Sequence, residues 1–320
     1  MIEATIAALG GFRPRRVVTN EELSRTVDTT PEWILSRVGI EERRIASDDE
    51  TLVGMGAAAS TAALDAAGLP ADAVDTVVVA TCTAETAIPQ AASRVARDIG
   101  ATRAGAFDVN AGCSGFAYGL AVARDLVRSG SAEVVLLTGT ERMSDWVDWT
   151  DRSTCVLLAD AAASALVVRS ESPGIHAPAW GSRGEEASVL GIPSRAEFFG
   201  QKGREVYRWA TSLGPEVARA LEVAGVAPED LRGFFPHQAN ERIIDLLAER
   251  LGLGDHVHVG KDIRWSGNTT SASIPLAMMR ALEQGDVAPG DLALLFGFGA
   301  GLSYAGQVVS LPDAWAVVDG

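Results

Sequence analysis

Three side chains with complementary chemistry stand far apart in the sequence, at Cys113, His237 and Asn268. Cysteine supplies a thiol that becomes a strong nucleophile when it ionises. Histidine can hold or donate a proton near neutral pH, and asparagine can donate hydrogen bonds but cannot ionise. If the fold brings them together, they form a nucleophile with a proton-handling partner and a hydrogen-bond donor. Cys113 alone is equally compatible with a small apolar thiol that fills a gap in the core.

The sequence around Cys113 predicts a junction between a strand and a helix. Residues 105–109 are typical of a short buried strand, and residues 116–128 of a helix that is apolar almost all round and therefore enclosed by the core. Cys113 then lies at the first turn of that helix, where unpaired amides and the helix dipole favour negative charge. We therefore expect Cys113 to ionise readily.

His237 and Asn268 are predicted to lie at similar junctions. His237 follows a strand at residues 233–236 and precedes a helix at residues 240–251. Asn268 begins a second small-residue helix, after a strand at residues 256–259. In sheets with parallel strands, ligands bind near the carboxyl ends of strands and the N-termini of helices. We therefore expect the three reactive side chains to converge there.

The sequence contains an internal repeat, which predicts two similar halves. Residues 62–69 and 219–226 match at a constant offset of 157 residues, and Asn268 follows Cys113 after 155 residues. Strands that alternate with helices predict βαβ units and mostly parallel sheets. Two such halves, each with an apolar helix, predict an α/β protein with five layers in the order helix, sheet, helix, sheet, helix.

A polar connector that contains proline and glycine, residues 170–174, marks the expected boundary between the halves. It gives an N-terminal half, residues 1–170, which carries the cysteine nucleophile, and a C-terminal half, residues 171–320, which carries the histidine and the asparagine. Residues 180–203 show no regular pattern and are predicted to form a surface loop region.

The composition excludes several classes of protein. With 47% hydrophobic and 22% charged residues, the chain can bury a sizeable core. Its formal net charge of −15 argues against nucleic-acid binding, which needs a basic surface. No apolar run approaches the roughly 18 residues of a membrane span, and we expect no leader, a reduced interior and a cytoplasmic location. Cys82 and Cys155 are interpreted as core thiols, and His256 and His258 lack a third ligand, so no metal site is expected.

Several motifs in a fixed order carry a resemblance to a known family. Residues 236–240 are Pro-His-Gln-Ala-Asn, residues 266–275 place Asn268 in a run of small residues, and Cys113 precedes both. In these motifs the chain resembles the β-ketoacyl-acyl-carrier-protein synthase III family of thiolase-fold condensing enzymes. Further motifs extend the resemblance over essentially the whole chain, at residues 32–40, 42–44, 149–152 and 297–301. The resemblance implies a thiolase-like five-layered αβαβα fold with two pseudo-symmetric halves, mixed, mostly parallel sheets and a homodimer.

The resemblance also implies a ping-pong reaction. Cys113 would take the acyl group of an acyl-CoA primer, while the backbone amides of Cys113 and Ala300 stabilise the oxyanion. Malonyl-acyl-carrier protein would then lose CO₂, and neutral His237 and Asn268 would donate hydrogen bonds to the enolate. Attack of the carbanion on the acyl-cysteine would yield β-ketoacyl-acyl-carrier protein. Acyl-CoA and malonyl-acyl-carrier protein are thus the implied substrates and partners, and no permanently bound cofactor is expected.

Four residues resemble the coenzyme A site of the family. Trp33 and Arg152 correspond to the pair that encloses the adenine by stacking and cation–π contact. Arg37 and Arg242 correspond to arginines near the phosphates. For Arg37, a solvated basic face of a short helix is an equally good interpretation.

The acyl carrier protein is acidic, so it needs a local basic patch despite the net negative charge of this chain. The candidates for that patch are Arg208, Arg242 and Arg250, although ordinary surface arginines explain the first and the last equally well. In the acyl pocket, Phe298 is expected to lie beside the two donors. Ile88 stands where the family has a gating side chain contributed across a dimer interface.

Other functions stay open at this point. The chain could load an unusual starter unit in polyketide or other specialised metabolism, or transfer an acyl group without forming a carbon–carbon bond. Asn268 disfavours simple transfer, which needs a base rather than a second donor. A non-catalytic acyl-CoA-binding scaffold is disfavoured because all three reactive residues are present. Alanines at residues 159 and 161–163, where the family has a glycine-rich segment, leave the primer and the pathway undetermined.

Overall fold

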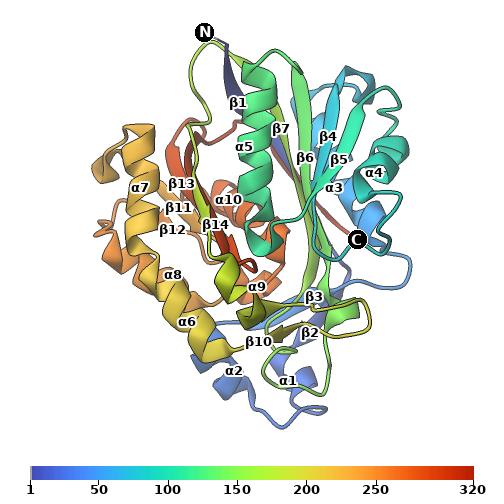
Figure 1. The fold of residues 1–320 in the computed structure, drawn as a ribbon, viewed down its shortest axis with the longest axis vertical. Coiled ribbons are helices and arrows are strands. Elements are labelled where there is room, and N and C mark those ends of the chain that lie inside the picture. The colour runs from blue at the N-terminus through green and yellow to red at the C-terminus, as the bar shows by residue number, and fades with distance from the viewer. Residues whose placement is uncertain (1) are drawn as a thin grey trace.

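Two large mixed sheets form the framework of the molecule, which the computed structural model describes over residues 2–320 (Figure 1). Within these residues, the first sheet has six strands in the order β15-β1-β7-β6-β4-β5, and the second has five in the order β12-β11-β13-β14-β8. The strands of the first sheet are β1 (Glu3–Arg13), β4 (Thr76–Ala80), β5 (Gly105–Val109), β6 (Val134–Arg142), β7 (Asp160–Ser170) and β15 (Trp315–Asp319). Those of the second are β8 (Ala179–Ser182), β11 (Gly233–Pro236), β12 (His258–Val259), β13 (Leu292–Gly299) and β14 (Ser303–Ser310). Two short antiparallel pairs join β2 (Arg16–Thr19) to β3 (Glu42–Ile45) and β9 (Leu190–Gly191) to β10 (Gly200–Gln201).

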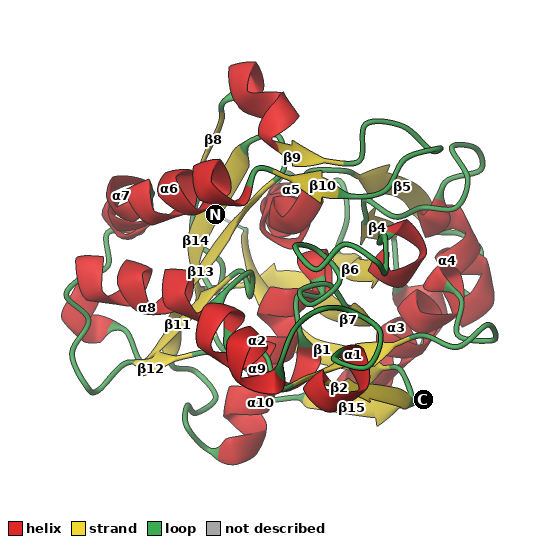
Figure 2. Cartoon of the chain, turned by 90° about the horizontal axis from the view of Figure 1, so that it is seen from below, coloured by secondary structure: helices red, strands yellow, loops and turns green. Residues whose placement is uncertain are grey.

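Helices lie in three layers, between the sheets and on their two outer faces (Figures 1 and 2). The helices α5 and α10 lie between the sheets, α3 and α4 cover the outer face of the first sheet, and α7 and α8 cover that of the second. The helices are α1 (Asn20–Leu23), α2 (Pro31–Val38), α3 (Leu52–Ala67), α4 (Ala91–Ile99), α5 (Gly115–Arg128), α6 (Gly203–Ser212), α7 (Gly214–Ala224), α8 (Glu241–Arg250), α9 (Ile263–Ser266) and α10 (Ser273–Gln284). The predicted five-layered αβαβα fold is therefore confirmed. No helix of the described chain combines the length and the apolarity needed to cross a membrane.

Strand β4 shows why the central strands are apolar throughout. Val77 and Val79 pack against α3 and α4, whereas Val78 and Ala80 pack against the helices between the sheets. Because both faces are covered, the four positions from Val77 to Ala80 are all buried, and the sequence shows no polar alternation. On the facing helix α5, Phe116 and its apolar neighbours are likewise enclosed on all sides.

The internal repeat seen in the sequence is present as a repeated order of elements. The helices α3 and α7 both end at a glycine in the left-handed region, Gly68 (φ 64°) and Gly225 (φ 66°), and each is followed by a short 3₁₀ turn and then by β4 or β11. Later in each half, a 3₁₀ turn precedes the central helix, at Gly112–Ser114 before α5 and at Thr270–Ala272 before α10. Cys113 lies within the first of these turns, and Asn268 lies two residues before the second.

The halves of the sequence do not coincide fully with the two sheets. Strand β15 returns to the first sheet, where Leu9 to Arg13 of β1 pair with it in parallel. A boundary near residue 170 falls at the end of β7, but the C-terminal residues 315–319 lie in the sheet of the N-terminal half. The division at residue 170 stays a prediction.

Two local expectations were wrong. Strand β5 is not buried: it is the edge strand of the first sheet, with Phe107 38% exposed. The sequence pattern of a strand does not tell whether another strand pairs with each of its two edges. The segment 180–203 is more than a surface loop, because it contains β8, β9 and β10 and buries Leu190.

Candidate active site

Cys113 lies in the 3₁₀ turn Gly112–Ser114, between β5 and α5. The chain enters this turn through Gly112 at φ 52°, a conformation that glycine adopts without steric cost. Across the turn lies Gly299, at the end of β13: a Cβ there would come within 2.7 Å of the Cys113 Cβ and 3.2 Å of its sulfur. The absence of a side chain at Gly299 therefore leaves the sulfur its space.

The Cys113 thiol is harder to ionise than the sequence predicted. Burial, and to a smaller extent the nearby Glu141 carboxyl, raise its pKa to about 12, although the backbone N–H groups of Cys113 and Ala300 act in the opposite direction. The helix-dipole argument was therefore wrong for the resting thiol, because desolvation outweighs the favourable amides. The backbone N–H groups of Cys113 and Ala300 would stabilise negative charge that develops beside the sulfur.

His237 directly follows β11, and 99% of the residue is buried. Its Nδ1 lies 2.8 Å from the Ser273 hydroxyl, which also accepts the Gln238 backbone N–H. This arrangement favours donation by the Ser273 hydroxyl to Nδ1, which leaves the proton of the ring on Nε2. Burial lowers the pKa of His237 to about 3, so the ring is neutral at pH 7, as predicted. The ring also makes an edge contact with Phe298, at 5.3 Å between centroids.

Asn268 precedes the 3₁₀ turn that leads into α10, and its backbone is fixed by hydrogen bonds to the segment 157–159 on both sides. Its side-chain Oδ1 accepts the Thr270 backbone N–H at 3.0 Å. Because the oxygen is occupied in this way, the Nδ2 group is the end that is free to donate. Thr270 achieves this geometry at φ 48°, which a β-branched residue rarely adopts.

One cavity brings the three reactive residues together. Cys113, His237 and Asn268 all line a cavity of about 190 Å³, together with Phe298 and Gly299. The sequence expectation that they would converge at strand ends and helix starts therefore matches their observed positions.

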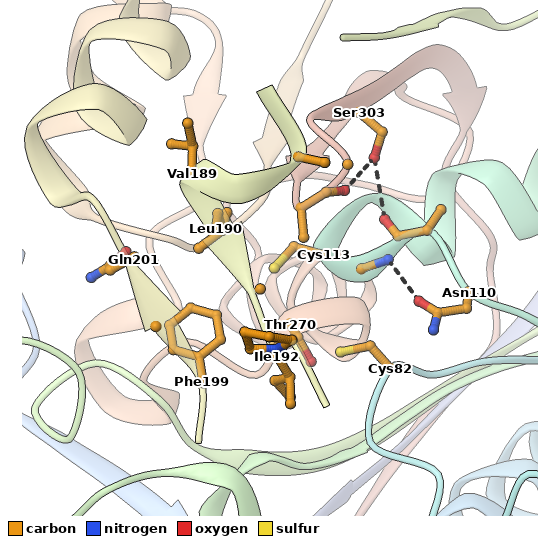
Figure 3. Close-up of a pocket in the computed structure, with 18 of the residues that line it drawn as sticks. Cys82, Asn110, Cys113, Val189, Leu190, Ile192, Phe199, Gln201, Thr270 and Ser303 are labelled. Carbon is orange, nitrogen blue, oxygen red and sulfur yellow. Dashed lines mark hydrogen bonds between the residues drawn. The ribbon is translucent and has the colours of Figure 1, made fainter. Parts of the chain in front are cut away.

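Cys113 also borders a second and larger cavity, of about 970 Å³ (Figure 3). This chamber is lined by Cys82, Asn110, Thr270, Ser303 and the strands β9 and β10 with the loop between them. Figure 3 shows Leu190 and Phe199 extending from this hairpin toward the space around Cys113. The sulfur thus lies where two cavities meet.

Comparisons with known proteins agree with this geometry. A family model described as 3-oxoacyl-[acyl-carrier-protein (ACP)] synthase III matches residues 107–184, and the model of its C-terminal part matches residues 221–311. The synthase III 4 of Streptomyces coelicolor is 48% identical over 312 residues, which cover 96% of this chain and 98% of the relative. The mycobacterial synthase III of Mycobacterium marinum is 44% identical over 97% of this chain and 96% of the relative.

The chain belongs to the β-ketoacyl-acyl-carrier-protein synthase III family.

Solved structures place this synthase III in the same fold. The priming β-ketosynthase of the R1128 polyketide pathway superposes with a TM-score of 0.95 at 43% identity and covers 97% of both chains. The synthase III of Pseudomonas aeruginosa PAO1 superposes with a TM-score of 0.92 at 37% identity, covering 98% of this chain and 99% of the other. The family resemblance, the thiolase fold and the assignment as an acyltransferase-type condensing enzyme are confirmed.

The expected coenzyme A residues of this synthase III fall into two groups. Trp33 and Arg152 line the 190 Å³ cavity, and the Arg152 guanidinium carbon lies 5.0 Å from the centre of the Trp33 ring. The two side chains therefore contact each other, and a base placed between them would have to separate them. Arg37 and Arg242 are exposed and lie outside that lining; Arg242 stacks over Tyr207 at 5.7 Å.

The remaining expected residues of the synthase III lie at the periphery. Arg208 on α6 and Arg250 on α8 are exposed, and Arg250 donates to the backbone carbonyl of Thr211. Phe298 lines the catalytic cavity, as expected. Ile88 is 88% exposed and lines neither of the two cavities of its own chain.

Sequence reasoning missed the residues that surround the nucleophile from other elements. Glu141, at the end of β6, is fully buried beside Cys113, and a charged residue inside an apolar strand was a signal that could have marked it. Leu190 and Phe199 gave no such signal, because they lie in an irregular segment. Only the folded chain places that segment over the sulfur.

Proposed function

We propose that Cys113 of this synthase III is the nucleophile that accepts the acyl group of an acyl-CoA primer. The sulfur would attack the thioester carbonyl, and the bond from that carbonyl to the coenzyme A sulfur would break to leave an acyl-enzyme. The departing coenzyme A thiolate would take up the proton that the Cys113 thiol gives up. The backbone N–H groups of Cys113 and Ala300 would hold the oxyanion, and losing one such donor typically costs about 3 kcal/mol. The single observation that supports this role best is the convergence of Cys113, His237 and Asn268 on one cavity.

The second half of the reaction is assigned to the two neutral donors. Malonyl-acyl-carrier protein would lose CO₂, and His237 through Nε2–H and Asn268 through Nδ2 would stabilise the enolate oxygen. The buried ring supports this assignment because its lowered pKa keeps it uncharged, and the occupied Oδ1 of Asn268 supports it because the amide then presents its donor end. The carbanion would attack the acyl-cysteine and give β-ketoacyl-acyl-carrier protein.

The substrates would reach Cys113 from the side of α2, α6 and α8. Trp33 and Arg152 at the outer end of the cavity would hold the adenine, and Arg37 and Arg242 would contact phosphates. For the acidic carrier protein we propose Arg208 and Arg242, with Arg250 and its tethered guanidinium nearby. Arg242→Glu should weaken the use of the carrier protein more than loading from acyl-CoA, and an unchanged ratio of the two activities would contradict this patch.

We also propose that the synthase works in the cytoplasm as a homodimer. The edge strand β5 has no strand on its outer side among the described residues and exposes an apolar side chain, Phe107, while the loop before α4 exposes Ile88. A second copy docked on this edge would cover both. It would also bring Ile88 toward the 970 Å³ chamber of the other copy, whereas Ile88 does not line the chamber of its own chain.

A second candidate concerns the primer. The chamber of about 970 Å³ is in the range of pockets that hold ligands far larger than an acetyl group. A starter unit longer than acetyl, or branched, would therefore fit beside Cys113. The likeness to a priming ketosynthase of a polyketide pathway favours the same possibility.

One experiment tests the function and the primer together. The protein is mixed with a panel of acyl-CoAs, and the mass of the Cys113 peptide is measured before malonyl-acyl-carrier protein is added and CO₂ is followed. We expect a covalent mass increase on Cys113, largest for a medium or branched acyl group, and then CO₂ release. No increase with any primer would contradict the nucleophile, and an increase without CO₂ would support simple acyl transfer instead.

A further inference from the structure

A buried carboxyl group lies beside the nucleophile and has no part in the reaction described above. Glu141 is fully enclosed at the end of β6. Its Oε2 lies 2.5 Å from the Thr83 hydroxyl and 3.1 Å from that of Thr81. The Cys82 backbone N–H is shared between the two oxygens, at 3.1 Å from Oε2 and 3.2 Å from Oε1. Its Oε1 lies 2.9 Å from the Ser271 hydroxyl. Among the described residues, no lysine or arginine pairs with it.

The hydrogen bonds around Glu141 are best satisfied if it carries a proton. The Ser271 hydroxyl lies 2.9 Å from Oε1 and also 2.9 Å from the backbone carbonyl of Ala80. It has one hydrogen, and the carbonyl oxygen can only accept, so Oε1 has to donate if both contacts are hydrogen bonds. On the other side, the hydroxyls of Thr81 and Thr83 each accept a backbone N–H and keep their own hydrogens for Oε2. The count therefore places the acid proton on Oε1.

The internal repeat explains why a carboxyl group occupies this place. Ser271 lies in the 3₁₀ turn before α10, as Cys113 lies in the turn before α5. Glu141, near the end of β6, corresponds in the same way to Gly299 at the end of β13. Beside Cys113 the glycine leaves an open site, whereas beside Ser271 the carboxyl fills the equivalent space. The place in the repeat that is equivalent to the site of Cys113 is thus filled by the hydrogen-bonded side chain of Glu141.

Glu141 is connected to the turn of Cys113 through Ser271, because the turn Gly112–Ser114 packs against the turn Thr270–Ala272. Gly115, two residues after Cys113, approaches so closely that a Cβ there would lie 3.3 Å from the Ala80 side chain and 3.6 Å from that of Ser271. The same Ser271 binds Glu141. Moving the carboxyl would therefore move the base of the turn that holds Cys113.

The charge of Glu141 also matters to the sulfur. Burial raises the pKa of Glu141, and a charged Glu141 would raise the pKa of the Cys113 thiol further. The other titratable groups that face the carboxyl are the thiols of Cys82 and Cys113, and both residues are half-buried. The neighbouring Arg142 turns away and pairs with Asp145 at 3.1 Å.

We propose that Glu141 is a positioning residue of the acyl-loading step, which holds a proton in the resting enzyme and ties Ser271 to the segment 81–83 beneath Cys113. As an uncharged group it supports the turn without opposing the thiolate. A carboxylate at the same place would repel the developing charge on sulfur. Only the loading readout of the following tests rests on the proposed function.

The first test uses Glu141→Gln, which preserves one acceptor and one donor and removes the possible charge. Alkylation of the Cys113 peptide by iodoacetamide is followed by mass spectrometry across a pH series. We expect equal rates for both proteins at neutral pH, and a faster variant only at alkaline pH, where the wild-type acid loses its proton. A variant that is about tenfold faster at pH 7, the factor of one pKa unit, would overturn the proton assignment.

Infrared difference spectra give a reading of the proton that does not depend on reactivity. The wild type should show the carbonyl stretch of a buried carboxylic acid at pH 7, shifted in D₂O, and Glu141→Gln should lack it. Absence of this band from the wild type would overturn the assignment as well.

The second test separates positioning from mere stability. Glu141→Ala should lose acyl loading by about tenfold or more, and Glu141→Gln should largely restore it while both unfold at similar denaturant concentrations. Ser271→Ala gives the same comparison if the alanine variant does not fold. Loading by Glu141→Ala or Ser271→Ala at the wild-type rate would overturn the positioning role. A wild type that no acyl-CoA loads would instead contradict the proposed function and leave the alkylation and infrared results standing.

Discussion

At the scale of single residues, the site works with groups that carry no charge at rest. The Cys113 thiol has its pKa raised to about 12, and His237 has its pKa lowered to about 3, both because they are buried. A free cysteine and histidine in contact would form an ion pair more readily. Here the low dielectric keeps both neutral, which agrees with the proposed role of His237 as a hydrogen-bond donor rather than a base.

The separate roles of the donors lead to the first prediction. His237→Ala and Asn268→Ala should each spare acylation of the enzyme and reduce CO₂ release by about 10²–10³-fold, the usual loss for one donor to a developing oxyanion. Mass spectrometry of the acyl-enzyme and a CO₂ assay measure the two steps. Cys113→Ala is the matched control and should lose loading altogether. Equal losses of both steps in the donor variants would count against the assignment.

The pKa of His237 leads to a second prediction, about pH. An unperturbed imidazole gains a proton as the pH falls through about 6.5, but this ring stays neutral until the pH approaches 3. Decarboxylation measured from preloaded enzyme should therefore show no acid limb near pH 6.5 and should stay level down to about pH 5. A fall by half at pH 6.5 that disappears in His237→Gln would show that the ring titrates in the ordinary range.

At the scale of elements, the close contact between β13 and the turn of Cys113 leads to a third prediction. A methyl group at Gly299 would come within 2.7 Å of the Cys113 Cβ, so Gly299→Ala must displace either the turn or the strand end. We expect loading to fall by about 10²-fold, as small misplacements of reacting groups commonly do. Gly184→Ala, which would meet nothing within 4 Å, is the control. Normal loading by Gly299→Ala would mean that the turn adapts freely.

The elements also show what the sequence could predict. The strands β4 and β11, which correspond to each other in the repeat, and the helices α5 and α10 were predictable because elements buried on both faces have apolar sequences. The edge position of β5 was not, since no local pattern reports a missing neighbour. The raised pKa of Cys113 was not predictable either, because it depends on burial and on Glu141, which only β6 brings close. The position of Leu190 near the sulfur was not predictable, because it depends on the path of an irregular segment of the chain.

The family motifs predicted more about the site than the patterns of polar and apolar residues did. Patterns placed Cys113, His237 and Asn268 at the ends of strands, and the motifs named their chemistry. Arg37, Arg242 and Ile88 show the limit of this transfer. They are exposed in the single chain, so its own contacts do not reveal the roles in substrate binding and dimer formation that we propose for them.

At the scale of the whole molecule, the exposed edge of β5 leads to a fourth prediction. Phe107→Asp places a charge on an apolar patch that we assign to the homodimer, so the variant should sediment as a monomer at concentrations where the wild type is a dimer. Val223→Asp, on the outer helix α7 and similarly exposed at 39%, is the control and should not change the assembly. A wild type that sediments as a monomer would remove the basis for Ile88 as a gate.

The pairing of β1 with β15 has a consequence for synthesis on the ribosome. Strand β1 precedes its parallel neighbour at residues 315–319 by about 300 residues, which take about 15–60 s to translate at ordinary elongation speeds. Throughout that interval the nascent chain carries a long apolar strand with one flank unprotected. We therefore expect this polypeptide to depend on chaperones while it is being made, and a stalled or shortened message to yield aggregates rather than a usable half.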